Sequence, residues 1–186
     1  MSLNSAAGSR AASPPVRRIL GIDPGTATTG FGVVEQQGNR FRAVEFGVIR
    51  TPAGQPLPER LERIFAGVNE IIERHRPQAA AVESRFFNVN VQTAFAVGQA
   101  RGVILLACSQ AGCTPFEYTP QQVKQAVVGY GKAEKHQVQE MVRVLLGLAE
   151  VPRPDDAADG LALALCHGQT RGVRERLAPF LEGRTP

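Results

Sequence analysis

Arg17-Arg18-Ile19-Leu20-Gly21-Ile22-Asp23-Pro24-Gly25-Thr26 is the stretch around which the rest of the chain is organised. Its apolar run predicts a short buried strand, and the residues from Asp23 onward form a turn signal. A second strand-like run, Thr28 to Val34, follows at once. We therefore expect a carboxylate at the exit of a central strand, although Asp23 could also be an ordinary turn residue.

Aspartate is distributed unevenly along the chain, which favours a functional role for Asp23. The sequence has 17 acidic residues, and the solvated positions elsewhere are occupied by glutamates. The only aspartates are Asp23, Asp155, Asp156 and Asp159. Aspartate is thus confined to one predicted strand end and one cluster near the C-terminus.

Length and composition indicate one globular domain. The chain has 186 residues with 43% hydrophobic content, enough to bury a core. No apolar run approaches the roughly 20 residues of a membrane span, and the N-terminus lacks a signal-peptide pattern, so we expect no membrane association. The three cysteines have no metal-type spacing. Reduced thiols and a cytoplasmic protein are expected.

Positive charge favours a polyanionic partner. The net charge is +4 and the pI is about 9.3. Only three lysines occur, Lys124, Lys132 and Lys135, and the other basic residues are arginines. This lysine window is either a solvated helix end or a surface that contacts phosphates.

The order of periodic segments predicts an α/β fold. Strands are expected at 17–22, 28–34, 41–49, 79–83 and 115–118, and helices at 61–72, 91–108, 120–128, 133–146 and from about 155. Three strands followed by alternating helices and strands predict a mixed sheet with helices on both faces. We expect a disordered N-terminal arm over 1–16, the folded domain over 17–170, and a basic, flexible tail over 171–186.

Further carboxylates extend the candidate site beyond Asp23. Glu83 ends the predicted strand 79–83, although a rim glutamate in water would look the same. Asp156 and Asp159 are three residues apart on a predicted helix and so share a face, whereas Asp155 is the expected N-cap. Hard oxygen ligands without His or Cys suit Mg²⁺ or Mn²⁺. The residues alone predict metal-dependent phosphoryl chemistry, in which such a cluster can hold two ions.

A ridge of small residues marks the helix predicted over 91–108. Ala94, Gly98 and Gly102 recur every fourth residue, so one face is almost without side chains. Such a face allows close approach of another element. Packing on the sheet and self-association both remain open on this pattern.

Six motifs occur in order and together resemble the bacterial RuvC Holliday junction resolvases. They are Ile22-Asp23-Pro24-Gly25-Thr26 with Gly30 and Gly32, Ala81-Val82-Glu83 with Phe86, residues 97–102 (VGQARG), residues 122–125 (QVKQ), Ala133-Glu134-Lys135, and residues 156–162 (DAADGLA). The resemblance implies an RNase H-like fold with a five-stranded mixed sheet. It also implies an endonuclease that acts as a homodimer on four-way junction DNA, making paired symmetric nicks that leave 5′-phosphate and 3′-hydroxyl ends.

The resemblance also assigns roles to residues. Asp23, Glu83, Asp156 and Asp159 match the family's catalytic carboxylates, and Lys124 and Lys135 match its functional lysines. Phe86 matches an aromatic residue that stacks on bases, while one of Phe86 and Phe87 is expected in the core. Arg85 and Lys132 add positive charge for DNA binding, and Asp155 could shift a metal ligand by one position.

The resemblance further implies two Mg²⁺ ions per site, with Mn²⁺ as a substitute. It also implies the branch-migration proteins RuvA and RuvB as partners.

Three other functions compete with this interpretation. A shorter RNase H-like RNA-processing nuclease shares the early aspartate and the late acid pair. A sugar kinase or actin-like ATPase would need two such domains, and an inactive DNA-binding module would not need four acids.

Overall fold

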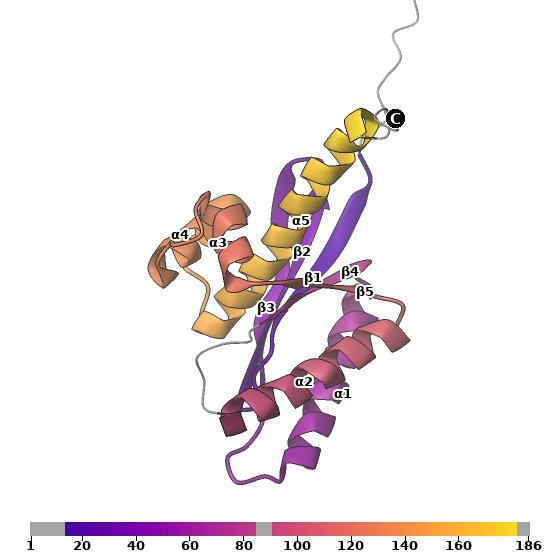
Figure 1. Ribbon diagram of the computed structural model, residues 1–186, viewed down its shortest axis with the longest axis vertical. Helices are drawn as coiled ribbons and strands as arrows, with labels where there is room; N and C mark the ends of the chain where they lie inside the picture. The colour runs from indigo at the N-terminus through magenta and orange to yellow at the C-terminus, as the bar shows by residue number, and fades with distance from the viewer. Residues whose placement is uncertain (1–13, 85–90, 182–186) are drawn as a thin grey trace, which may run out of the picture.

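The fold is centred on a five-stranded mixed sheet (Figure 1). The structure is a computed structural model that describes residues 14–84 and 91–181, with the backbone alone at residue 91 and over 173–181. Its strands are β1 (Val16–Asp23), β2 (Thr28–Gln37), β3 (Arg40–Arg50), β4 (Ala79–Glu83) and β5 (Thr114–Tyr118). They lie in the order β3-β2-β1-β4-β5, which places β1 in the centre.

Strand direction determines where the polar strand ends meet. β2 and β3 pair antiparallel as a meander beside β1, whereas β4 and β5 run parallel to β1. Ile22 pairs with Val82, and Glu83 pairs with Tyr118. Because the carboxyl ends of parallel strands lie at one edge, Asp23 and Glu83 end neighbouring strands at the same edge of the sheet.

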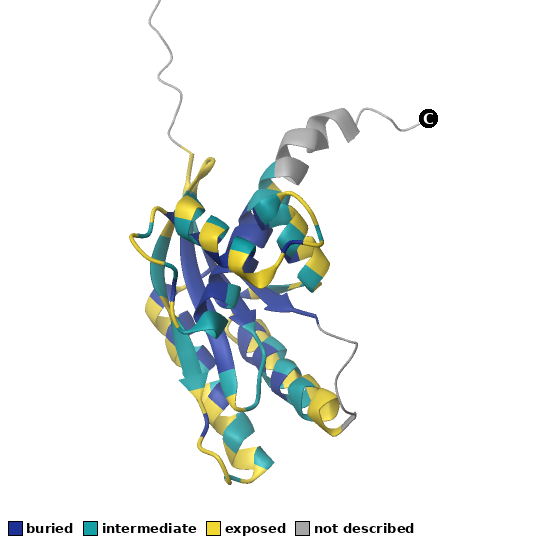
Figure 2. Ribbon diagram, turned by 90° about the vertical axis from the view of Figure 1, so that its left-hand side faces the viewer, coloured by how far each residue is buried: buried dark blue, intermediate teal, exposed yellow. Residues whose placement is uncertain are grey.

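Helices cover both faces of the sheet, as predicted. α1 (Leu57–His75) and α2 (Val91–Gln110) pack on one face, and α3 (Pro120–Val128), α4 (Lys135–Leu146) and α5 (Asp155–Leu181) pack on the other (Figure 1). β1, β2 and β4 are largely buried, whereas the edge strands β3 and β5 and the outer helix sides are partly or fully exposed (Figure 2). The expected fold class is therefore confirmed.

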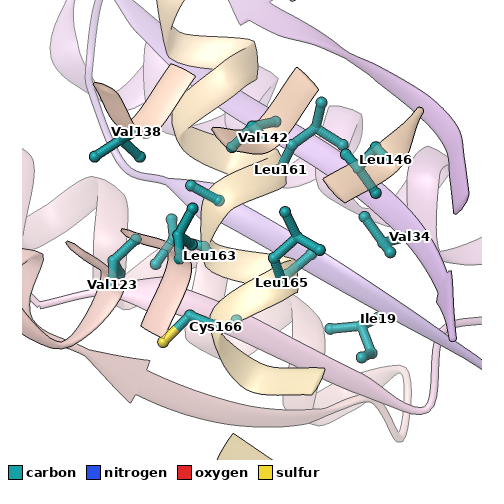
Figure 3. Close-up of a cluster of buried hydrophobic side chains, with 14 of the residues drawn as sticks. Ile19, Val34, Val123, Val138, Val142, Leu146, Leu161, Leu163, Leu165 and Cys166 are labelled. Atoms are coloured by element: carbon teal, nitrogen blue, oxygen red, sulfur yellow. The ribbon is translucent and has the colours of Figure 1, made fainter. Parts of the chain in front are cut away.

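Each face has its own hydrophobic core. On the α1 and α2 side, Leu20 and Ile22 of β1 pack with Ile64, Val68 and Ile104. On the other side, Ile19 and Val34 pack with Leu161 and Leu165 of α5 and with residues of α3 and α4 (Figure 3). Alternate residues of β1 thus point to opposite cores, as expected for a central strand.

α5 lies directly on β1 and β2 because glycines line the contact. A Cβ on Gly21 would lie 1.9 Å from the carbonyl oxygen of Gly160, and a Cβ on Gly160 would lie 2.5 Å from the carbonyl carbon of Phe31. Neither position can accept a side chain without movement of the backbone. This close packing fixes the first turns of α5 against the strand that carries Asp23.

Some predicted boundaries differ from the structure. β1 begins at Val16, one residue before the expected domain start, and α5 continues to Leu181, past the expected tail boundary at 171. The prediction that Asp155 is the N-cap is wrong, because Asp155 is the first residue of α5 and its carboxylate pairs with Arg153 and Lys135. Within the described ranges, no helix is both long and apolar enough to span a membrane.

Candidate metal centre

Three aspartates converge at the carboxyl end of β1. Asp23 comes from the last position of that strand, and Asp156 and Asp159 come from the start of α5. One carboxylate oxygen from each lies within 4.8 Å of the other two, and all three residues are half-buried. The spacing of three residues places both helix aspartates on the side that faces Asp23.

The donor set of this cluster fits a divalent cation. Mg²⁺ binds oxygens at about 2.0–2.1 Å, so two ligands of one ion lie at most about 4.2 Å apart. The three carboxylate oxygens lie within 4.8 Å of one another, so small side-chain rotations would bring them to that separation. Three carboxylates without a cation also repel one another. Asp23, Asp156 and Asp159 are therefore the residues that could hold Mg²⁺ or Mn²⁺.

Glu83 lies in a groove beside the aspartate cluster. The groove has a volume of about 250 Å³ and is lined by polar groups from four elements, Glu83, Lys124, Lys135 and Asp159, together with apolar residues of α3, α4 and α5. Asp159 belongs to both the cluster and the groove. Glu83 is 8% exposed and lies outside the group of three converging aspartates. The structure thus places Glu83 in the same groove as Lys124, Lys135 and Asp159.

Lys135 contacts the acidic cluster directly. Its Nζ donates to Asp159 Oδ2 at 3.2 Å and lies 3.6 Å from Asp155 Oδ2. Burial alone would lower the pKa of Lys135, but the carboxylates of Asp159 and then Asp155 outweigh it and raise the pKa above its ordinary value. Lys135 therefore carries a positive charge at the rim of the candidate site.

The other predicted DNA-contacting residues fall in different places. Lys124 on α3 lines the groove with Lys135, whereas Lys132 is exposed in the loop between α3 and α4. Arg85 and Phe86 lie outside the described residues, as does Phe87. The structure therefore brings two of the three lysines to the carboxylates.

Residues that sequence reasoning missed hold the turn after Asp23. Thr51 Oγ1 donates to the Thr26 carbonyl at 2.6 Å, and Arg60 Nε donates to Thr51 Oγ1 at 2.8 Å. Thr29 Oγ1 also donates to the Gly25 carbonyl at 2.7 Å. Thr51 begins a Pro/Gly-rich linker in the sequence, so local patterns carry no signal for this long-range contact.

Comparison with known proteins identifies a family that matches most of the chain. The sequence model of "Crossover junction endodeoxyribonuclease RuvC" matches residues 19–167. A protein of that name from Rubrobacter xylanophilus is 66% identical over 149 residues, covering 80% of this chain and 83% of its own length. A second, from Chloroflexus aggregans, is 60% identical over 159 residues, covering 86% and 97%.

Solved structures agree with these sequence matches. T. thermophilus RuvC in complex with a Holliday junction substrate is 43% identical to this chain, with a TM-score of 0.81 over 84% of this chain and 96% of that one. The yeast mitochondrial Holliday junction resolvase has a TM-score of 0.66 over 94% of this chain and 89% of its own. At 14% identity, that second likeness concerns the fold alone.

Proposed function

Because this chain belongs to the family of crossover junction endodeoxyribonucleases RuvC, we propose that it cuts four-way DNA junctions at the groove between the three aspartates and the two lysines. The convergence of Asp23, Asp156 and Asp159 on one point is the observation that carries this proposal. The products are expected to be paired symmetric nicks with 5′-phosphate and 3′-hydroxyl ends, made in recombination and repair.

Asp23, Asp156 and Asp159 would hold a divalent cation, and Glu83 would be an additional ligand for a second one. Mg²⁺ is the proposed ion, with Mn²⁺ as a substitute, because the ligands are oxygens. Such ions supply Lewis acidity that lowers the pKa of a bound water and neutralises charge on phosphate oxygens. The closeness of Lys135 to Asp159, 3.2 Å, supports a cleavage site at the rim where lysine and cluster meet.

Lys124 and Lys135 would bind and orient the scissile phosphate. Both line the groove that contains Glu83 and Asp159, so a phosphate entering it meets positive charge. Ammonium groups fixed beside a reacting phosphate stabilise the negative charge that develops there in the transition state. We propose Lys132, Arg85 and Phe86 as further DNA contacts, with Phe86 stacking on bases, on the basis of family membership.

α2 supports the proposed homodimer. Phe95 is 70% exposed and Leu106 is 51% exposed, both large apolar residues on this helix. A Cβ on Gly98 or Gly102 would meet nothing within 4 Å, so the glycines of the predicted ridge do not pack on the sheet. An exposed apolar helix surface with small residues suits close packing against a second copy. Two copies would supply one site for each of two symmetric cuts.

Family membership alone supports two further proposals. RuvA and RuvB, the branch-migration proteins, are proposed partners. The cytoplasm is the proposed location, because the proposed substrate is bacterial DNA.

The proposal is tested by cleavage of a labelled synthetic four-way junction and of linear duplex with the same arm sequences. Mg²⁺, Mn²⁺ and chelator are compared, and cuts are mapped on all four strands. Paired, metal-dependent nicks at symmetric positions on the junction alone are expected. Equal cleavage of duplex and junction would contradict the proposal. A structured RNA is included as a third substrate, and cleavage of that RNA alone would favour an RNase H-like RNA-processing nuclease.

A further inference from the structure

We propose that Asp155 is a positioning residue, which holds the Lys135 ammonium beside Asp159 and does not bind the metal. This inference rests on the proposed function of the three-aspartate site. Asp155 is the one aspartate of the chain that lies outside that site, although it is adjacent in sequence to Asp156.

Helix geometry separates Asp155 from the metal side of α5. With about 100° between successive residues, Asp156 lies about 60° to one side of Asp159 and Asp155 about 40° to the other. The Asp156 side contains Asp23. The Asp155 side contains Lys135, the first residue of α4. Asp159 lies between the two, with an oxygen within 4.8 Å of one from Asp23 and another contact, at 3.2 Å, with Lys135.

The two oxygens of Asp155 are already engaged by two cationic side chains. Lys135 Nζ lies 3.6 Å from Oδ2, and Arg153 donates to Oδ1. Arg153 therefore holds the carboxylate by Oδ1, and this orientation keeps Oδ2 toward Lys135.

Lys135 needs such a restraint because its side chain is long and 54% exposed. Fixing a lysine side chain costs rotamer entropy, so a single contact at the rim holds it weakly. Its contact with Asp159 uses a carboxylate that is also a candidate metal ligand. Asp155 offers a second anionic contact that does not depend on the metal. The ammonium would thus stay at the groove when Asp159 turns toward a cation.

Lysine spectroscopy tests the positioning role without any assay of activity. Because the chain has only three lysines, isotope-labelled lysine gives three side-chain signals. Asp155→Asn is expected to shift the Lys135 Cε–Hε signal toward that of a free lysine and to narrow it, leaving Lys124 and Lys132 unchanged. Glu150→Gln removes the same charge from an exposed acid of the preceding loop and should move none of them. An unchanged Lys135 signal in Asp155→Asn would overturn the proposal whether or not the protein cuts junctions.

Metal binding and a double-mutant cycle separate positioning from ligation. Direct Mn²⁺ binding, measured by electron paramagnetic resonance without DNA, should weaken at least about tenfold in Asp156→Asn but remain within about twofold in Asp155→Asn. Single-turnover cleavage should fall about tenfold in Asp155→Asn, and by less than about twofold when Lys135→Met is already present. If Mn²⁺ binding weakened equally in Asp155→Asn and Asp156→Asn, Asp155 would be a metal ligand. The same conclusion would follow if Asp155→Asn still reduced the cleavage rate about tenfold in the Lys135→Met background.

Discussion

Gly30 and Asp156 touch so closely that a methyl group cannot fit between them. A Cβ on Gly30 would lie 2.0 Å from the Asp156 carbonyl oxygen and 2.9 Å from the Asp156 Cβ. Gly30 is also the residue of β2 that pairs with Asp23. The separation of the two carboxylates, one on the strand and one on the helix, is therefore set by the missing side chain of the residue between them.

Gly30→Ala should consequently damage the site more than the fold. Overpacking of this kind costs about 1–3 kcal/mol, and here it is relieved by moving the first turn of α5 away from Asp23. We expect thermal unfolding to show a lower stability of the variant. Junction cleavage should fall at least about tenfold at temperatures where the variant is folded. Gly172→Ala in the same helix is the control, because its nearest contact would be at 3.9 Å. Full activity of a folded Gly30→Ala protein would contradict this account.

Asp23→Asn should separate cleavage from binding. The variant keeps the size of the side chain but removes one of the three converging carboxylates. If the transition state of cleavage loses several kcal/mol of charge stabilisation, the cleavage rate should be about 10³-fold lower. Junction affinity, measured by gel shift in chelator, should stay within about threefold, because phosphate binding rests on lysines. A large loss of affinity in a folded variant would count against the proposed division of roles.

Lys124→Ala should reduce the salt dependence of junction binding. If Lys124 in the groove neutralises one phosphate, the slope of log affinity against log salt should decrease by about 0.9. Arg40→Ala is the control, because Arg40 is exposed and begins β3 at the end of the sheet opposite Asp23. An unchanged slope in Lys124→Ala would place Lys124 off the DNA path.

The elements of this fold were predictable because their signals are local. Apolar runs such as Ala79–Val82, the Thr119-Pro120 helix start and the helical face of α1 gave strands and helices close to their observed bounds. Thr119 does accept from the Gln122 backbone amide at 3.2 Å, as its N-cap role requires. The mixed sheet followed from the order of these elements. Each of these signals comes from residues that are close together in the sequence, so strands and helices could be predicted without the structure.

The candidate site was predictable only in part, because its precise geometry depends on contacts between distant segments. The spacing of Asp156 and Asp159 indicates one face of a helix, and both do meet Asp23. That Glu83 shares a groove with Lys124, Lys135 and Asp159 follows from how α3 and α4 lie on α5, for which no local pattern exists. The partner of Asp155 was missed for the same reason, since Lys135 is twenty residues away in the sequence.

Buried His167 should make folding stability depend on pH. Its side chain is 2% exposed, and the Tyr118 hydroxyl lies 2.9 Å from its Nδ1. Burial, with a smaller contribution from Arg171, lowers its pKa to about 4 from the ordinary 6.5. Between these values the unfolded chain takes up a proton that the folded chain does not. The contribution of His167 is therefore complete above pH 6.5 and is lost as the pH falls toward 4, by up to about 3 kcal/mol.

Urea unfolding at several pH values measures this contribution. In His167→Gln, the free energy of unfolding should lose the part of its pH dependence that lies between pH 4 and 6.5. His136→Gln removes a histidine whose side chain is 74% exposed and should leave the wild-type profile. If the free energy of unfolding of His167→Gln kept the full wild-type dependence on pH between pH 4 and 6.5, the buried histidine would not be the source of that dependence.

Leu106→Arg should dissociate the proposed homodimer. The side chain is 51% exposed on α2, and a charge there would have to be buried without a partner if this surface packs against a second copy. Val144 on α4 is 54% exposed and lies on a helix outside the proposed contact, so Val144→Arg is a control of equal exposure. Light scattering after size exclusion should give a monomer mass for the first variant and a dimer mass for the second. The monomeric variant should also lose the pairing of nicks, because one copy carries one site. A dimer that survives Leu106→Arg but not Val144→Arg would move the contact to α4.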